Sequence, residues 1–187
     1  MPQERTRKIV VAGILSAISV FLGLSRLGFI PWLSGASLTI MHVPVIIGAI
    51  LEGPWVGAAI GLIFGLFSML QAAIAPNGPT DVLFTNPLIA VLPRLLVGPI
   101  AWLVWRALQK LPVVGLISAG VIGSLAHTFM VLEMIHLTSG NISWAVLGPI
   151  AIANGIPEAV LSAILVLAVV AAWRQIQVGK RKGANLE

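Results

Sequence analysis

The sequence predicts an all-α integral membrane protein with six transmembrane helices and both termini in the cytoplasm. Hydrophobic residues make up 58% of the 187 residues, charged residues only 9%, and the mean hydropathy is +1.04. A soluble domain carries about 25% charged residues. Since each span needs ~20 residues, residues 1–187 hold six short helices in a single membrane domain. An extramembrane catalytic or nucleotide-binding domain is therefore excluded.

The first predicted span covers residues 9–24, an uninterrupted apolar run. It carries two pairs of small residues four positions apart: Ala12 with Ser16, and Gly13 with Ala17. Such spacing lets a second helix approach closely within lipid. Packing inside the bundle is the more frequent use of this motif, and docking of a partner helix is the alternative.

The second and third spans are predicted at residues 38–51 and 55–73, on either side of Glu52-Gly53-Pro54. One continuous helix over both would be about 54 Å long at 1.5 Å per residue, whereas the hydrocarbon core is ~30 Å thick. A tight hairpin is therefore required. Glycines at positions 53, 57, 61 and 65 share one face, which favours close helix packing over a sliding surface.

The fourth span, residues 87–109, contains Pro93 and Arg94. A guanidinium stays protonated, and a charge at membrane depth normally faces a bundle interior or a wet cavity and serves a function. Pro93 lacks the N–H that would pair with the carbonyl of Ile89, so we expect a kink and a free acceptor. We interpret Arg94 as ligand-facing; the alternative is an ion pair with a buried glutamate.

The last two spans are predicted at residues 113–137 and 147–173. They supply further candidate substrate-binding residues, and the complete candidate set is Arg94, Asn86, Glu133, His136, Asn154, Glu158 and His42. Either Glu133 or Glu158 could neutralise Arg94. We interpret His127, in the middle of span five, as a hydrogen-bonded packing residue.

The distribution of basic residues predicts the orientation. Three precede span one, two (Arg106 and Lys110) lie at the end of span four, and four follow span six, so nine of the eleven Lys and Arg lie on the side of the termini. Only Arg26 falls on the other side. By the positive-inside rule, the termini are cytoplasmic. This orientation, rather than nucleic-acid binding, explains the net charge of +5.

With this orientation, the candidate polar residues share the outer half of the membrane, which favours a cup open to the outside. A membrane enzyme using Glu133, His136 and Glu158 is a rival interpretation, but the sequence offers no nucleophile–base pair. Glu133-x-x-His136 is half of a carboxylate metal site without a second half, so we expect neither metal nor cofactor. A secondary carrier would need inverted repeats, and none is visible.

Five short strings in the sequence resemble a known family: LTIMHVP at residues 38–44, GPWVG and GLIFG between 53 and 65, and NP followed by LPRLLVG between 86 and 98. They are similar to the substrate-binding (S) component of energy-coupling factor (ECF) vitamin transporters, and most similar to the pantothenate-type branch. Related branches carry other vitamins, such as lipoate or cobalamin.

The resemblance implies a subunit of the bacterial cell membrane that captures a vitamin outside. It would dock on a transmembrane coupling protein, the T component, served by two ATPases. In such proteins the pocket is formed mainly by helices four to six, the regions that here hold Arg94, Glu133, His136, Asn154 and Glu158. Helix one carries the docking motif, usually two alanines four apart, which places docking on Ala12, Gly13, Ser16 and Ala17.

Overall fold

The computed structural model describes residues 2–30, 38–76, 81–140 and 142–175. They are nearly all helical. The elements are α1 (Pro2–Leu24), β1 (Phe29–Ile30), β2 (Leu38–Thr39), α2 (Val43–Glu52), α3 (Pro54–Ile74), the 3₁₀ helix η1 (Asp81–Thr85), α4 (Pro87–Ala90), α5 (Leu92–Leu108), α6 (Pro112–Thr138) and α7 (Trp144–Arg174). The basic residues at 180–182, which entered the orientation argument, lie outside the described residues.

By length and composition, five helical stretches among the described residues could cross a membrane. They are Gln3–Leu24, Pro54–Ile74, Pro87–Leu108, Pro112–Thr138 and Trp144–Arg174. The remaining apolar helix, α2, has ten residues and is about 15 Å long, half of a ~30 Å hydrocarbon core. Nine of these ten residues are buried, so α2 is an internal helix of the bundle.

The helix predicted for residues 38–51 was wrong at its start, because α2 begins only at Val43. Leu38 and Thr39 instead form β2, which pairs antiparallel with β1. Pro44 explains the difference: its ring lacks an N–H and would clash with the carbonyl of Ile40 in a longer helix, while it is well suited to a first turn. The predicted hairpin is confirmed, since only Gly53, with φ of 103°, separates α2 from α3.

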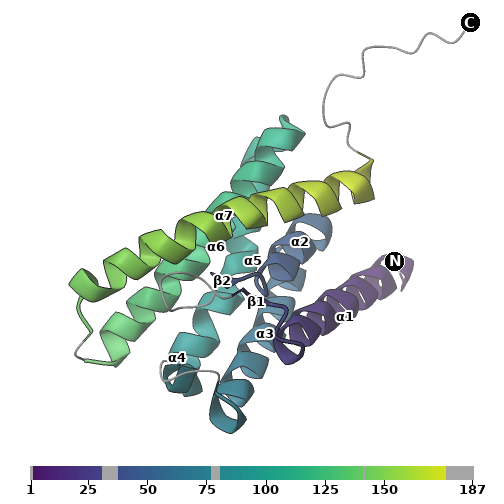
Figure 1. Cartoon of the computed structure of the whole chain (residues 1–187). Coiled ribbons are helices and arrows are strands. Elements are labelled where there is room, and N and C mark those ends of the chain that lie inside the picture. Colours follow the sequence, from purple (N-terminus) through teal and green to yellow (C-terminus); the bar gives the residue numbers. More distant parts are fainter. Residues whose placement is uncertain (1, 31–37, 77–80, 141, 176–187) are drawn as a thin grey trace, which may run out of the picture.

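In the bundle, α6 packs against α5 and α7, while α3 packs against α5 and α2. Figure 1 shows α7 running obliquely across α6 and α2, with α1 at the edge of the bundle. The glycine face of α3 makes close packing possible: a methyl group at Gly57 would lie 3.0 Å from the Cα atom of Gly98, and one at Gly65 would lie 2.8 Å from the carbonyl oxygen of Ala90. Gly53 does not belong to this face, because it forms the α2–α3 break.

Both α1 and α7 are tied to the same end of α2. Arg7 of α1 forms an ion pair of 2.9 Å with Glu52, the last residue of α2. Arg174, the last residue of α7, donates a 2.7 Å hydrogen bond to the carbonyl oxygen of Ile50 and stacks over Trp105. The first turns of α1 and the last turn of α7 therefore lie at one end of the bundle.

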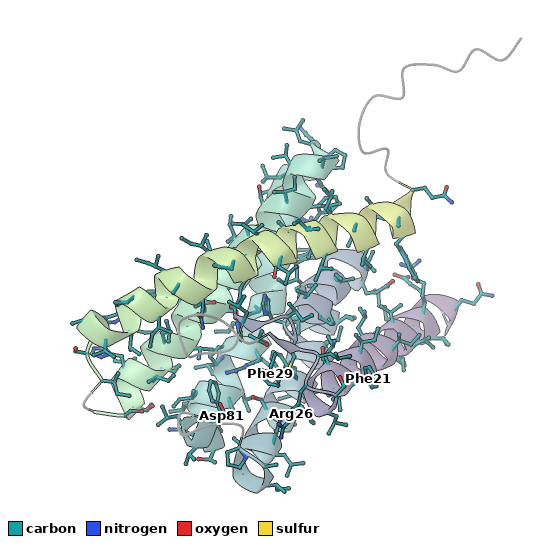
Figure 2. The ribbon with its side chains drawn as sticks, in the orientation of Figure 1. Phe21, Arg26, Phe29 and Asp81 are labelled. Carbon is teal, nitrogen blue, oxygen red and sulfur yellow. The ribbon has the colours of Figure 1, made fainter. Side chains whose placement is uncertain are left out.

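The far end of α1 leads into the strand pair. Arg26 has φ of 59°, a left-handed conformation that often follows a helix end, and its side chain is exposed. Figure 2 shows Phe21, Arg26 and Phe29 around this end of α1, with Asp81 marking the start of η1. Phe21 is 62% exposed and belongs to the apolar outer surface of α1.

Candidate functional site

Arg94 is positioned by a break in its own helix. Pro93 interrupts the backbone hydrogen bonding, and Val91 separates α4 from α5. The break between α4 and α5 confirms the predicted interruption of the helix. The carbonyl oxygen of Ile89, which Pro93 cannot bond, accepts a 2.5 Å hydrogen bond from Nη1 of Arg94 instead. The side chain is thus folded back toward the break and only 5% exposed.

Two aromatic rings lie against the Arg94 guanidinium. Its Cζ atom lies 4.8 Å from the ring centroid of Phe84, in η1, and 5.4 Å from that of Phe64, in α3. Such contacts contribute about 0.5–2 kcal/mol each. Nε is buried and has no hydrogen-bond partner among the described residues. The guanidinium thus keeps donors to spare in an apolar setting, which suits an anionic ligand.

Glu158 lies near Arg94 without pairing with it. Its two oxygens accept hydrogen bonds from the backbone N–H of Thr39 (2.6 Å) and the hydroxyl of Thr128 (3.1 Å). The charges of Arg94 and Glu158 are close enough to attract. Among the described residues, however, the ion pairs within 4.0 Å are Arg7–Glu52 and Lys8–Glu4. The expected alternative, a direct ion pair between Arg94 and a buried glutamate, is not formed in the described part of the chain.

His42 is fully buried directly before α2. Its Nε2 atom lies 2.8 Å from the hydroxyl of Ser162 in α7 and 3.1 Å from that of Ser124 in α6. The sequence alone did not suggest this serine–histidine arrangement. Because all three side chains have 0% exposure, we assign it to joining three helices rather than to chemistry on a substrate. The ring of His127 stacks on His42 with centroids 4.9 Å apart.

Glu133 and His136 lie in a separate cluster near the α6–α7 link. Glu133 accepts a 3.1 Å hydrogen bond from the ring N–H of Trp144, the first residue of α7. Nδ1 of His136 lies 2.8 Å from the carbonyl oxygen of Ile142. These two predicted site residues therefore hold the start of α7 against α6, and neither contacts Arg94 through a hydrogen bond or ion pair.

Asn86 and Asn154 complete the predicted set. Asn86 caps α4, since its side-chain oxygen accepts a 3.0 Å hydrogen bond from the backbone N–H of Leu88. Asn154 is 7% exposed and lies one turn before Glu158 on α7. The structure thus brings Arg94, Glu158 and His42 into one buried region. Among the described residues, no group of three or more His, Cys, Asp and Glu is arranged to hold a metal ion.

Sequence reasoning missed several members of this buried region: Thr39, Phe64, Phe84, Ser124, Thr128 and Ser162. A signal for two of them was present. Ser162 continues the four-residue spacing of Asn154 and Glu158 along α7, and Ser124 lies one turn before Thr128 on α6. The same spacing that linked the asparagine to the glutamate therefore extends to a longer polar stripe.

The sequence of this chain is similar to those of known proteins. The family model described as the ECF transporter, substrate-specific component, matches residues 7–170. This chain belongs to that family. The pantothenic acid transporter PanT of Lactococcus lactis subsp. cremoris (strain MG1363) is 31% identical over a 191-residue alignment that covers 92% of this chain and 96% of the relative. The pantothenate transporter PanT of Leuconostoc mesenteroides subsp. mesenteroides is 32% identical over 144 residues, 74% of this chain and 71% of the relative.

As an ECF S component, the chain is a transporter subunit and not an enzyme, and a multi-pass protein of a bacterial plasma membrane. Membership in this family implies, in general, a vitamin substrate and partner subunits that include a T component and ATPases.

The four residues predicted for docking in this S component divide between two faces of α1. Ser16 is 5% exposed, and Ala12 packs against the core. Gly13 and Ala17 are exposed, and a methyl group at Gly13 would meet no atom within 4 Å. Only the pair Gly13/Ala17 is therefore on an open surface.

Proposed function

We propose that this S component captures pantothenate or a similar carboxylate vitamin on the outer face of the membrane. It then delivers the vitamin through a T component driven by two ATPases. The observation that carries the proposal is the buried Arg94 guanidinium, which has an unpartnered Nε and no carboxylate of the described chain within ion-pair distance. The relatives named as pantothenate transporters support the choice of substrate.

The proposed topology has six crossings and cytoplasmic termini. The second crossing is made by β2 together with α2, because α2 alone is too short to cross. The ties of Arg7 and Arg174 to the end of α2 support placing both termini on one side. The basic residues near both ends make that side cytoplasmic.

In the proposed site, Arg94 binds the substrate carboxylate through a charge-assisted contact, which a planar guanidinium can make in bidentate form. Glu158, Asn154 and His42 form the polar surroundings of this contact. The proposal gives Asn86, Glu133 and His136 a supporting part, because each already has a hydrogen bond within the chain.

Calorimetry with purified protein in detergent tests this assignment. Arg94→Ala should weaken pantothenate binding by about 100-fold or more, since removing one partner of a buried charged contact costs 2–5 kcal/mol. Arg106→Ala is the matched control, because Arg106 lies on the same helix with an exposed side chain stacked on Trp102. Unchanged affinity of a folded Arg94→Ala variant would show that the arginine is structural.

Docking on the T component is proposed for the exposed pair Gly13/Ala17. In lipid, small residues rather than apolar burial allow helices to approach closely. Gly13→Trp should leave ligand affinity intact and abolish ATP-dependent uptake in vesicles that contain the coupling module. Ser16→Trp is the contrast, because Ser16 is buried and its enlargement should disturb the bundle itself. Uptake retained by Gly13→Trp would refute this docking face.

A further inference from the structure

His127, on α6, is 4% exposed, and neither of its ring nitrogens has a hydrogen-bond partner in the described part of the chain. A neutral imidazole carries one donor and one acceptor. A buried polar group without a partner is costly, and native proteins rarely keep one without a reason. Within the described part of the chain, His127 is therefore a buried residue, as expected, but without the hydrogen bond that was expected for it.

The neighbouring polar groups are already engaged elsewhere. The hydroxyls of Ser124 and Ser162 bind His42, and the hydroxyl of Thr128 binds Glu158. His127 instead stacks on His42, with an interplanar angle of 15°. Two serine hydroxyls hold Nε2 of His42, while its Nδ1 has no partner among the residues that the structure describes. The stack holds the His127 ring in place and leaves both its nitrogens available.

The side chains of His127 and Arg94 both lie close to the ring of Phe64. The His127 ring centroid lies 6.2 Å from that of Phe64, and Cζ of Arg94 lies 5.4 Å from the same centroid. Nε of Arg94 is also buried and, in the described ranges, has no hydrogen-bond partner. Two helices, α5 and α6, thus present unsatisfied donors and an unsatisfied acceptor around one aromatic ring of α3.

We propose that His127 is a second substrate-contacting residue, which recognises a hydroxyl or amide group of the molecule whose carboxylate Arg94 holds. The substrate class is then a carboxylic acid with a hydroxyl or amide group a few bonds away. A hydroxyl or amide can both donate and accept, and so can engage a neutral imidazole. This inference rests on the proposed function and narrows it: pantothenate has these groups, whereas lipoate, a carboxylate on an apolar chain, does not.

The test compares binding of pantothenate and lipoate to the full-length protein by calorimetry. A site that hydrogen-bonds a substrate group discriminates strongly against analogues lacking it. His127→Phe keeps a ring and removes both nitrogens, so it should weaken pantothenate binding by about tenfold to 100-fold and leave lipoate binding unchanged. His127→Gln, which restores a donor and an acceptor, should recover part of the affinity. Equal affinity of wild type and His127→Phe for pantothenate would overturn the proposal.

Thermal unfolding of the ligand-free protein gives a readout independent of the substrate's identity. If His127 is reserved for a ligand, His127→Phe should leave the apparent Tm unchanged or raise it. His136→Phe provides the structural comparison and should lower Tm, because Nδ1 of His136 is bonded to Ile142. A lower Tm for ligand-free His127→Phe would overturn the proposal. If wild type fails to bind pantothenate, the substrate proposal fails, and the Tm comparison still decides the role of His127.

Discussion

The contact between α3 and α5 brings one glycine, Gly61, against the backbone of Arg94, the residue of the proposed substrate site. A methyl group added at Gly61 would fall on the backbone carbonyl of Arg94, 2.8 Å from its carbon and closer still to its oxygen. Non-bonded carbon atoms are best placed about 3.5–4.0 Å apart. Gly61→Ala therefore requires α3 and α5 to separate by roughly 1 Å, and the atoms displaced belong to the residue proposed to bind the substrate.

The expected cost follows from two opposing effects. Overpacking a close contact costs about 1–3 kcal/mol, while alanine in a helix interior is favoured over glycine by about 0.5–1 kcal/mol. Gly61→Ala should thus lower the apparent Tm. The displacement of Arg94 should also weaken its contact with the substrate. A loss of about 1.4 kcal/mol in binding free energy corresponds to a tenfold loss of affinity, so we expect substrate binding to weaken by about tenfold.

Unfolding in detergent and calorimetry, applied to three alanine variants, check this reasoning. Gly148→Ala is the neutral control, because a methyl group there meets no atom within 4 Å. Gly57→Ala crowds Ala49 and Gly98. Because Gly98 lies one turn after Arg94 on α5, this variant should lower Tm with a smaller effect on affinity than Gly61→Ala. A Gly61→Ala variant with wild-type Tm and affinity would refute the close α3–α5 contact.

Further predictions concern the hydrogen bonds around the site and at the bundle ends. Thr128→Val removes one of the two donors to Glu158 and should cost about 1–3 kcal/mol by leaving a buried oxygen unpaired, measured as a lower Tm. Arg7→Ala leaves the buried Glu52 carboxylate without its cation and should lower Tm, whereas adding Glu52→Gln should restore part of the loss. Trp144→Phe removes one indole hydrogen bond. It should lower the free energy of unfolding by about 1 kcal/mol, measured as a lower Tm, without changing substrate affinity.

Local chemistry explains what the sequence predicted well. The apolar runs located the long helices because length and hydropathy are properties of a single segment. The missing N–H of Pro93 predicted both the break and the free Ile89 carbonyl, and the structure adds only that the next side chain, Arg94, occupies it. The hairpin at Gly53 was predicted from length, since one helix over both apolar runs would be far longer than the hydrocarbon core is thick.

Long-range partners could not be predicted in this way. Glu158 is bonded to the backbone of Thr39, and His42 to Ser162, across more than a hundred residues in each case. No spacing within one segment reports such pairings. The sequence therefore grouped Glu133 with Glu158 by residue type and depth, although Glu133 already has the ring N–H of Trp144 as its donor.

The paired small residues of α1 show what burial adds to a motif. Both pairs have the same spacing, and spacing alone puts either one on a helix face. Neighbouring side chains decide between them: Ser16 is covered by the bundle, whereas Gly13 is flanked by Ile9, 67% exposed, and Ile14, 55% exposed. A soluble protein would rarely leave such a surface uncovered. In a bilayer, lipid covers this surface without competing strongly against a partner helix, so the exposed surface at Gly13 can face lipid and still accept a second protein, as proposed for docking.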